Sequence, residues 1–317
     1  MLAKQHVWCH SVVCSRLRFS KERIDTLAPG NRLQRRLAIH AQQFIEMATA
    51  AVPHPSTEDA ISRHDWMAPI RESVETVGEF GRFSWRVGKA IITPPYEWRE
   101  FIHQLDVIGA ASMPLIALAG AATGVVLSLQ TRESLSRFGA KSVLPAVIVF
   151  SLIKETGPII TGLVASGRVG AGIGAELGSM KVTEQIDAME ASAVDPHRYL
   201  VATRVAAAVI ALPLLTIFAD FCGILGGWFA STMAEPVSLQ LFAGSGFKSV
   251  RFSDIILPTL KTTVFGLIIG LVSSFQGMRT RGGTEGVGRS ATSSVVLSSL
   301  LIIVADVILV RIIIEFL

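Results

Sequence analysis

Charged side chains within apolar segments are the residues of this sequence best suited to chemistry. A charge at the centre of a membrane span costs about 2.5 to 3.5 kcal/mol, so we expect these charges to pair or to face a polar cavity. Pairing could serve only to fix how helices pack. Alternatively, the charges could line a cavity that admits a charged headgroup. The residues in question are Lys154, Glu155, Asp220, Lys261 and Asp306.

The hydrophilic segment 178–196 is a second candidate, because it still has a helical pattern. Its acidic residues recur three apart and would share one helix face, while Ile186 and Met189 would follow a neighbouring apolar face. Thr183 is suited to cap the helix N-terminus, and Pro196 disfavours helix at the residue before it. Such a helix could dock in a partner's groove, although an acidic face that only meets water has the same pattern. The acidic residues are Glu184, Asp187 and Glu190, followed by Asp195.

Several motifs of enzymes are missing from the sequence. No G-x-x-x-x-G-K-[ST] motif occurs, so ATP and its Mg²⁺ would have to be bound by a partner subunit. No H-E-x-x-H or G-x-S-x-G motif occurs either. The spacing of Cys9, His10 and Cys14 matches none of the usual zinc patterns. We therefore expect no catalytic residue, no metal site and no cofactor bound by this chain itself.

The elements that hold the charged residues are long and apolar. The chain is 50% hydrophobic and only 17% charged, and its mean hydropathy is +0.50. This balance is untypical of a soluble globular protein. A helix needs about 20 residues to cross the hydrocarbon core of a membrane. Residues 105–317 are therefore predicted to form an all-α domain of five transmembrane helices, near 107–129, 143–166, 205–233, 255–275 and 292–316.

Lys and Arg are unequally distributed between the two sides of these spans. They are more frequent before the first span and in the loops 167–204 and 276–291 than in the two intervening loops. Loops rich in Lys and Arg stay in the cytoplasm. We therefore expect a cytoplasmic N-terminus and a C-terminus on the outside.

Two different segments precede the spans. Residues 1–65 mix charges, Ser, Pro and His without periodicity, and we interpret them as a mostly disordered basic extension. Their basic excess is typical of a segment retained on the cytoplasmic side of a membrane, which we prefer to nucleic-acid binding. Within 66–104, apolar residues from Phe80 to Ile91 recur at helical spacing beside a cationic stripe. This amphipathic helix is suited to the membrane interface, the alternative being a helix packed on a soluble core.

Several motifs together resemble the MlaE/YrbE permease family, over about residues 75–317. The combination is specific, and the first 65 residues or so fall outside it. The motifs are KETGP at 154–158, ASGRVG at 165–170, AELGSMKVTEQIDAME at 175–190, AVDP at 193–196, LPLLT at 212–216, GGTEGVGRS at 282–290 and AD at 305–306.

The resemblance implies an architecture and a set of partners. It implies five transmembrane helices after an interfacial helix, a homodimer of permease copies, cytoplasmic ABC ATPase subunits and an MCE-domain protein on the outer side. Lipid, with phospholipid as the expected class, would then move between the membrane and the MCE-domain partner. The membrane would be the bacterial inner membrane, with an organellar inner envelope as the alternative.

The resemblance also assigns roles to residues. The segment 178–196 would receive the ATPase stroke, with Glu184 and Asp195 in its characteristic motif. Two departures from the family pattern concern charge: a Lys–Glu pair stands where Arg–Glu is frequent, and Asp220 matches no charged family position. Lysine is a point charge, whereas arginine offers a planar fork to a phosphate. The residues that would line the lipid cavity are Lys154, Glu155, Lys261 and Asp306.

Two other functions are compatible with the residues alone. One is a polytopic scaffold or regulator without a translocation path, and the other is a membrane-embedded enzyme that modifies lipids. An ATPase subunit that copurifies through the segment 178–196 would favour transport. Lipid turnover without nucleotide or partner would favour the enzyme.

Overall fold

The structure is a computed structural model that describes residues 68–94, 97–233, 235–248 and 250–316. The predicted basic extension 1–65 lies outside the described residues. Residues Arg71–Leu317 form one compact unit, which contains every element after the first described helix. All regular structure in the described ranges is helical, which confirms the predicted all-α class.

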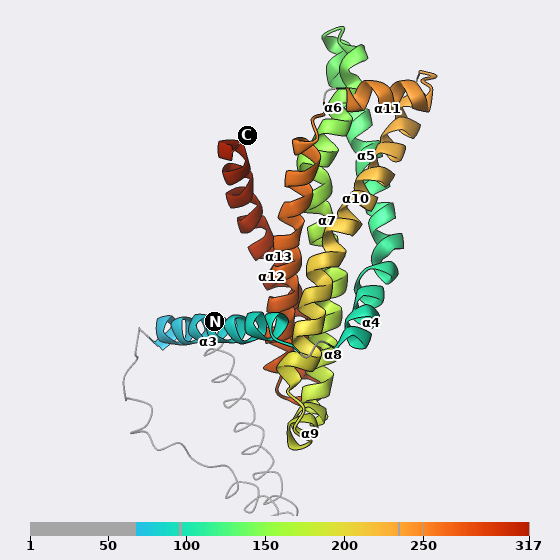
Figure 1. The fold of residues 1–317 in the computed structure, drawn as a ribbon. Coiled ribbons are helices and arrows are strands. Elements are labelled where there is room, and N and C mark those ends of the chain that lie inside the picture. Colours follow the sequence, from blue (N-terminus) through green and yellow to red (C-terminus); the bar gives the residue numbers. More distant parts are fainter. Residues whose placement is uncertain (1–67, 95–96, 234, 249, 317) are drawn as a thin grey trace, which may run out of the picture. The chain divides into compact units, whose positions relative to one another are not determined.

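The first described helix, α3 (Ala68–Ile92), is amphipathic as the sequence predicts. Val87 on its apolar side is fully buried, and Phe83 packs against the same core. Phe80 and Phe83 meet the ring of Phe275 edge to face, with ring centroids 5.3 and 5.4 Å away. Figure 1 shows α3 crossing near one end of the spans. The apolar side of α3 is thus held by the spans, while its position in the headgroup plane stays a prediction.

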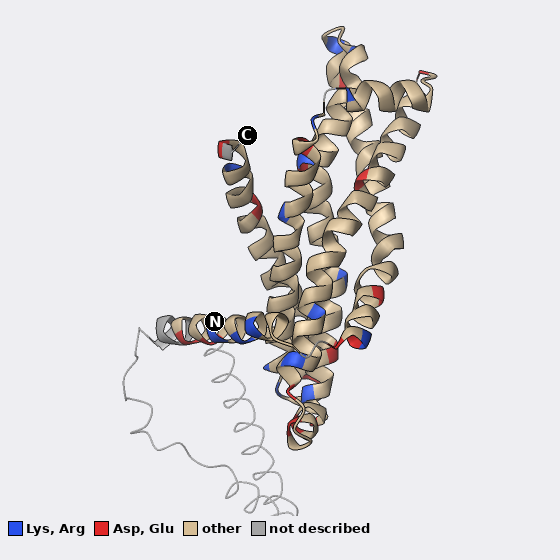
Figure 2. Cartoon of the chain, viewed as in Figure 1, with Lys and Arg blue, Asp and Glu red and all other residues tan. Residues whose placement is uncertain are grey.

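Five helical stretches within the described residues are long and apolar enough to cross a membrane. Each corresponds to one of the five predicted segments and runs beyond it at one or both ends. Figure 2 shows that charged residues are sparse along the stretches and concentrate around α3, α4 and α9. The stretches are Trp98–Arg137, Lys141–Val182, His197–Thr232, Ser253–Met278 and Gly283–Glu315.

The first two stretches are built from several consecutive helices. The first consists of α4 (Trp98–Ile108), the 3-10 turn Ala110–Ser112 and α5 (Met113–Arg137). The second contains two π-helical turns, η3 and η4, whose hydrogen bonds join residues five apart. Its parts are the 3-10 turn Lys141–Val143, α6 (Leu144–Ser151), η3 (Leu152–Thr156), α7 (Gly157–Ala165), η4 (Ser166–Gly170) and α8 (Ala171–Val182).

The remaining elements follow in chain order. A short helix, α9, follows α8, and a third π-helical turn, η5, leads into the long helix α10. Their bounds are α9 (Gln185–Ala191), η5 (His197–Ala202), α10 (Thr203–Thr232), α11 (Leu239–Phe247), α12 (Ser253–Met278) and α13 (Gly283–Phe316).

Small residues let the long helices approach closely. Where α10 packs against α5, a Cβ atom added to Gly124 would lie 1.8 Å from the carbonyl oxygen of Gly223. Where α10 packs against α12, a Cβ atom on Gly266 would lie 2.5 Å from the carbonyl oxygen of Ala208. Apolar side chains gain nothing by leaving lipid, so close backbone packing supplies much of the attraction between membrane helices.

Large apolar side chains remain exposed along the spans. A contiguous apolar surface of this kind is rare on soluble proteins and marks contact with a membrane or with another apolar surface. It supports the assignment of these helices to a membrane. Examples are Leu118, Leu214, Phe221, Leu300 and Val307.

Candidate functional site

Lys154 and Glu155 lie in the π-helical turn η3 of the second span. Pro158 stands at the start of α7 and has no N–H to donate to the carbonyl of Lys154, as an α-helix would require. Instead, the N–H of Gly157 donates to the carbonyl oxygen of Leu152, five residues back. The sequence around Pro158 therefore interrupts the α-helix at the two charged residues.

Lys261, in α12, lies between carboxylates from two other spans. Its Nζ donates a hydrogen bond to Oε2 of Glu155 at 2.7 Å and lies 2.9 Å from Oδ1 of Asp306 in α13. The side chain of Lys261 is 1% exposed and that of Asp306 is 10% exposed, whereas Glu155 is 43% exposed. We call Glu155, Lys261 and Asp306 the span triad. It brings together three of the four predicted cavity residues.

The contact between Lys261 and Asp306 is an ion pair without the alignment of a hydrogen bond. The Oδ1 atom of Asp306 is buried and has no hydrogen-bond donor among the described residues, although the ammonium is 2.9 Å away. A close ion pair still compensates a buried charge. The triad is thus held by charge at Asp306 and by both charge and a hydrogen bond at Glu155.

Lys154, the fourth predicted cavity residue, stands apart from the span triad. Its Nζ lies 4.0 Å from Oδ1 of Asp254 and 4.8 Å from the centre of the Phe150 ring. The side chain is 29% exposed. Its ammonium is therefore held less closely than that of Lys261 and is more accessible.

Asp254 is a residue of this site that the sequence prediction missed. It lies one position before the predicted apolar segment 255–275 and in the first turn of α12. It precedes Lys261 by seven residues, which is two helical turns, so both residues share a face of α12. This spacing is the signal that could have found it. Among the residues that the structure describes, no three His, Cys, Asp or Glu side chains are arranged to hold a metal ion.

Asp220 lies in α10, outside the span triad. Its side chain is buried, and Oδ1 has no hydrogen-bond partner in the described part of the chain. The carboxyl group packs closely against Gly157, because a Cβ atom at that position would lie 1.7 Å from Oδ1 of Asp220. Asp220 therefore contacts the backbone beside η3, where only glycine leaves room for it.

The predicted coupling segment 178–196 forms the end of α8, then α9. Thr183 does not cap the N-terminus of α9, so this prediction is wrong: its Oγ1 donates to the carbonyl oxygen of Ser179, at the C-terminal end of α8. Glu184 instead connects the two helices with a left-handed backbone, at a φ of 60°. The α8 carbonyls offered Thr183 a local acceptor, which a threonine readily takes.

The apolar side of α9 packs on the chain's own core. Ile186 is 1% exposed and Met189 packs against the same cluster, so this side is not available to a partner. The acidic residues point elsewhere: Glu184, Asp187 and Glu190 are all exposed. Asp187 accepts a hydrogen bond from Lys181 at 2.6 Å.

Asp195 has a local structural contact. Its Oδ1 accepts a hydrogen bond from the backbone N–H of His197 at 3.0 Å, just before the π-helical turn η5. Asp195 thus ends the loop after α9 and starts the approach to the third span. Its predicted role toward an ATPase stays a prediction.

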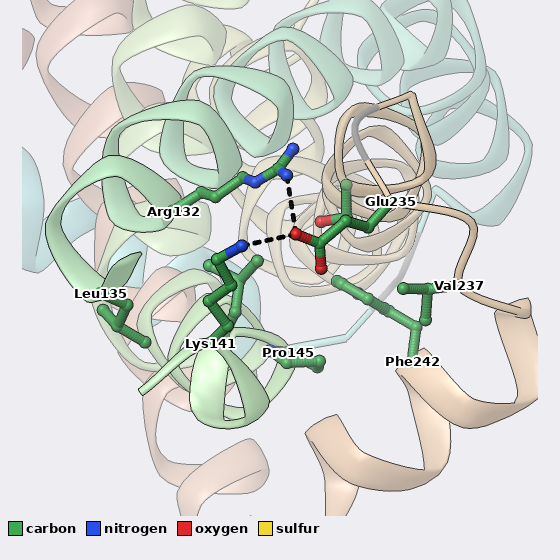
Figure 3. A pocket seen from close by; sticks show the side chains of 9 residues that line it. Arg132, Leu135, Lys141, Pro145, Glu235, Val237 and Phe242 are labelled. Carbon is green, nitrogen blue, oxygen red and sulfur yellow. Dashed lines mark hydrogen bonds and ion pairs between the residues drawn. The ribbon is translucent and has the colours of Figure 1, made fainter. Parts of the chain in front are cut away.

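A second charged cluster lies at the end of the spans opposite α9 (Figures 1 and 3). Oε1 of Glu235 accepts hydrogen bonds from Lys141 at 2.6 Å and from Arg132 at 3.2 Å. We call these three residues the loop cluster. They line a small cavity of about 60 Å³ together with apolar residues such as Val237 and Phe242. The hydrogen bond and charge of Lys141, with Arg132 beside them, lower the pKa of Glu235.

Comparison with known proteins places the chain in a family. The family model described as Permease MlaE matches residues 101–312. A probable ABC transporter permease protein of Rickettsia typhi is 40% identical over 232 residues, which are 73% of this chain and 90% of that protein. The intermembrane phospholipid transport system permease protein MlaE of Haemophilus influenzae is 32% identical over 243 residues, or 75% of this chain and 93% of that protein.

A plant protein is also similar to this chain. The chloroplastic protein TRIGALACTOSYLDIACYLGLYCEROL 1 of Arabidopsis thaliana is 33% identical over 219 residues, which are 69% of this chain and 63% of that protein. The family model spans the three middle membrane stretches completely and nearly all of the first and the fifth, from residue 101 in α4 to residue 312 near the end of α13. It also includes every residue of the span triad. The chain therefore belongs to the MlaE permease family.

Proposed function

We propose that this chain is the membrane-spanning subunit of an ABC transporter that moves phospholipids. The observation that carries the proposal is the cluster of charges within the spans. Lys261 lies between the carboxylates of Glu155 and Asp306. The more accessible Lys154 lies in the same π-helical turn as Glu155. Family membership supports the transport role, and the name of the Haemophilus influenzae relative supports the substrate class.

The two lysines have different parts in this proposal. Lys261 already has two carboxylates within 3 Å, so an entering phosphate would have to displace at least one of them. Among the described carboxylates, Lys154 has Asp254 alone as an ion-pair partner, at 4.0 Å, and its side chain is partly exposed. The lipid phosphate would thus first meet Lys154, with Glu155 at its side as the exposed member of the span triad. Charges attract more strongly here than in water because the surroundings have a low dielectric constant.

The energy for transport would come from a separate ATPase that binds ATP and Mg²⁺. Its contact would be the exposed acidic face of α9, with Glu184, Asp187 and Glu190. The second span runs as one helical stretch from Lys141 to Val182 and contains Glu155. A push on α9 would therefore reach the charged site through α8 and the two π-helical turns.

The remaining partners follow from the family and from the exposed surface. A second copy of the chain would cover part of the apolar surface of the spans and complete a homodimer. An MCE-domain protein would accept or deliver lipid at the end of the spans that carries the loop cluster. The complex would reside in the bacterial inner membrane, or an organellar inner envelope, with α9 in the cytoplasm.

A charge reversal on α9 tests the proposal. We expect Glu184→Lys to abolish ATP-dependent phospholipid transfer between vesicles and to reduce copurification of the ATPase, while insertion stays intact. The backbone at position 184 is left-handed, and an unbranched glutamate and an unbranched lysine meet the same strain there. The substitution should therefore not change the fold. The matched control is Asp106→Lys, an exposed acidic residue on α4 at the same end of the molecule. Normal ATPase binding and transfer in Glu184→Lys would contradict the coupling role.

A further inference from the structure

A groove lies between the C-terminal end of α3, the start of α4 and the start of α10. Its walls are mostly apolar and include Ala206 and Ile210 of α10. Trp98 and Phe101 form an aromatic corner, with ring centroids 6.1 Å apart and ring planes at 87°. The volume is about 230 Å³, which is less than sites that enclose a whole small molecule usually have. The groove is therefore suited to hold part of a larger ligand.

Two side chains of opposite charge, Arg198 and Glu97, line this groove. Nη2 of Arg198 donates to the carbonyl oxygens of Thr93 and Pro94, the latter at 2.7 Å, which fixes the guanidinium at the end of α3. Its buried Nε has no acceptor among the described residues. Glu97 is exposed, directly before α4, and its carboxylate has no ion-pair partner in the described ranges. The groove thus presents a cation and an anion that do not neutralise each other.

An apolar strip extends from the charged part of the groove along α10. Ala202, Ala206 and Ile210 recur four apart, so they lie one above the other on one helix face. The two alanines leave space that larger side chains would fill, and Ile210 is 48% exposed. A hydrocarbon chain can lie along this strip, with protein on one side and membrane lipid on the other.

We propose that this groove binds one phospholipid whose headgroup carries a primary ammonium. The phosphate lies at Arg198, because a guanidinium donates strong hydrogen bonds to phosphate oxygens. The ammonium lies at Glu97 and beside Trp98, whose ring attracts cations and suits the membrane interface. One acyl chain follows the apolar strip. A phospholipid with an anionic headgroup and no ammonium meets the same Arg198 but leaves Glu97 without a partner and repelled.

The groove is separate from the charged site within the spans. It shares no residue with the span triad or with Lys154. It lies at the end of the molecule that carries α9, where Figure 1 shows α3 and α4. The proposal does not rest on the transport function, and Lys154→Gln should leave lipid binding in the groove unchanged.

Fluorescence of Trp98 provides the test, because its ring lines the groove. The full-length chain would keep Trp98 as its single tryptophan and be reconstituted in phosphatidylcholine vesicles. One set of vesicles contains brominated phosphatidylethanolamine, and a second set contains the same fraction of brominated phosphatidylglycerol. The bromine atoms of both lipids quench nearby tryptophan. We expect stronger quenching by the phosphatidylethanolamine. The tryptophans changed to phenylalanine are Trp8, Trp66, Trp85 and Trp228.

Two variants locate the binding determinants without disturbing Arg198. Glu97→Gln should remove the preference for phosphatidylethanolamine, because it removes the partner of the ammonium. Ala206→Leu should reduce quenching by both lipids, because it fills the apolar strip. The matched control is Ala122→Leu, which adds the same bulk on the exposed side of α5 and should change nothing. A chain that keeps only Trp85, which is 80% exposed on α3, reports contact with bulk lipid.

Two results would overturn the proposal. Equal quenching by both brominated lipids, unchanged in Ala206→Leu, would mean that Trp98 meets only bulk lipid. Quenching of Trp98 below that of Trp85 with either lipid would mean that the groove is closed or is filled by a protein segment. Thermal unfolding of each variant, followed by circular dichroism, verifies that the compared proteins are folded.

Discussion

The span triad and the loop cluster are mirror images in charge but differ in burial. In the span triad one lysine lies between two carboxylates, and in the loop cluster one carboxylate lies between two cations. The distances are similar, with 2.7 and 2.9 Å in the first and 2.6 and 3.2 Å in the second. Lys261 is 1% exposed, whereas Lys141 is 49% and Glu235 is 52% exposed.

This difference in burial decides what each cluster contributes. Water already solvates the charges of the loop cluster, so pairing them adds little free energy. Lys261 and Asp306 of the span triad are buried and have lost their water, so each depends on its partners for compensation, whereas Glu155 is 43% exposed. Equal geometry therefore predicts unequal consequences of mutation. The span triad is costly to keep in a membrane protein, which favours a functional role for it.

The largest effect is expected from Lys261→Met. This change leaves Glu155 and the buried Asp306 without their cation, and removal of one partner from a buried ion pair costs about 3 to 5 kcal/mol. We expect a large loss of folded protein in the membrane and a lower unfolding temperature in detergent. Lys141→Met in the loop cluster is the matched control and should cost about 0 to 1 kcal/mol. Equal losses in the two variants would refute the comparison.

A double mutant measures the coupling inside the span triad. Glu155→Ala and Lys261→Ala should each impair lipid transport and lower the abundance of the protein. The double mutant should lose less than the sum, because each single change leaves a charge without its partner. Membrane abundance and lipid flux must both be measured. If the triad only holds the helices together, any mutant that folds would transport lipid at the normal rate.

A smaller and more selective effect is expected from Lys154→Gln. Its ammonium lies 4.0 Å from Asp254 and 4.8 Å from the centre of the Phe150 ring, and the side chain is 29% exposed, so its loss should leave the amount of folded protein nearly unchanged. Phospholipid flux per folded molecule should fall, since the phosphate loses its first cation. Lys141→Gln removes a lysine of the loop cluster, at the first residue of the second span, and should leave flux unchanged. Normal flux in Lys154→Gln would remove this residue from the lipid path.

The smallest effect is expected from Glu235→Gln, and it should depend on pH. Because the folded state lowers the pKa of Glu235, the loop cluster stabilises the protein above the ordinary pKa of a glutamate. The contribution is lost as the pH falls through the lowered pKa. The variant should therefore be slightly less stable than the natural chain at neutral pH and equal to it in acid. High salt should also reduce the difference, because these charges are exposed. Thermal unfolding in detergent measures both effects.

The span triad was predictable in its members but not in its geometry. The cost of charge in a membrane singled out Lys154, Glu155, Asp220, Lys261 and Asp306, and the family resemblance then selected all of these except Asp220 as cavity residues. Three of them meet and Lys154 does not, because the π-helical turn before Pro158 sets the direction of each side chain. Periodicity within one span says nothing about the rotation of another. Asp254 was missed because it lies just outside the apolar run, although its spacing from Lys261 indicated a shared face.

The segment 178–196 shows a different limit of sequence reasoning. The helix and its two stripes were predictable, since α9 buries Ile186 and exposes its acidic residues. The binding partner of the apolar stripe was not, because a core of the same chain and a groove of another protein favour the same residues. The hydroxyl of Thr183 donates to a carbonyl oxygen in α8. The residue type alone therefore did not determine whether Thr183 would cap the start of α9 or bond to the end of α8.

The contact between Asp220 and Gly157 links two positions of the sequence that are 63 residues apart. A methyl group at position 157 would overlap the carboxyl oxygen of Asp220, because a Cβ atom there would lie 1.7 Å from Oδ1. Substitutions at the two positions are therefore not independent. In an alignment of relatives, we expect a side chain larger than hydrogen at position 157 only where position 220 carries a smaller residue than aspartate. Asp220 is then one half of a covarying pair, and its presence in the sequence reflects a packing constraint with Gly157 instead of a contact with a substrate.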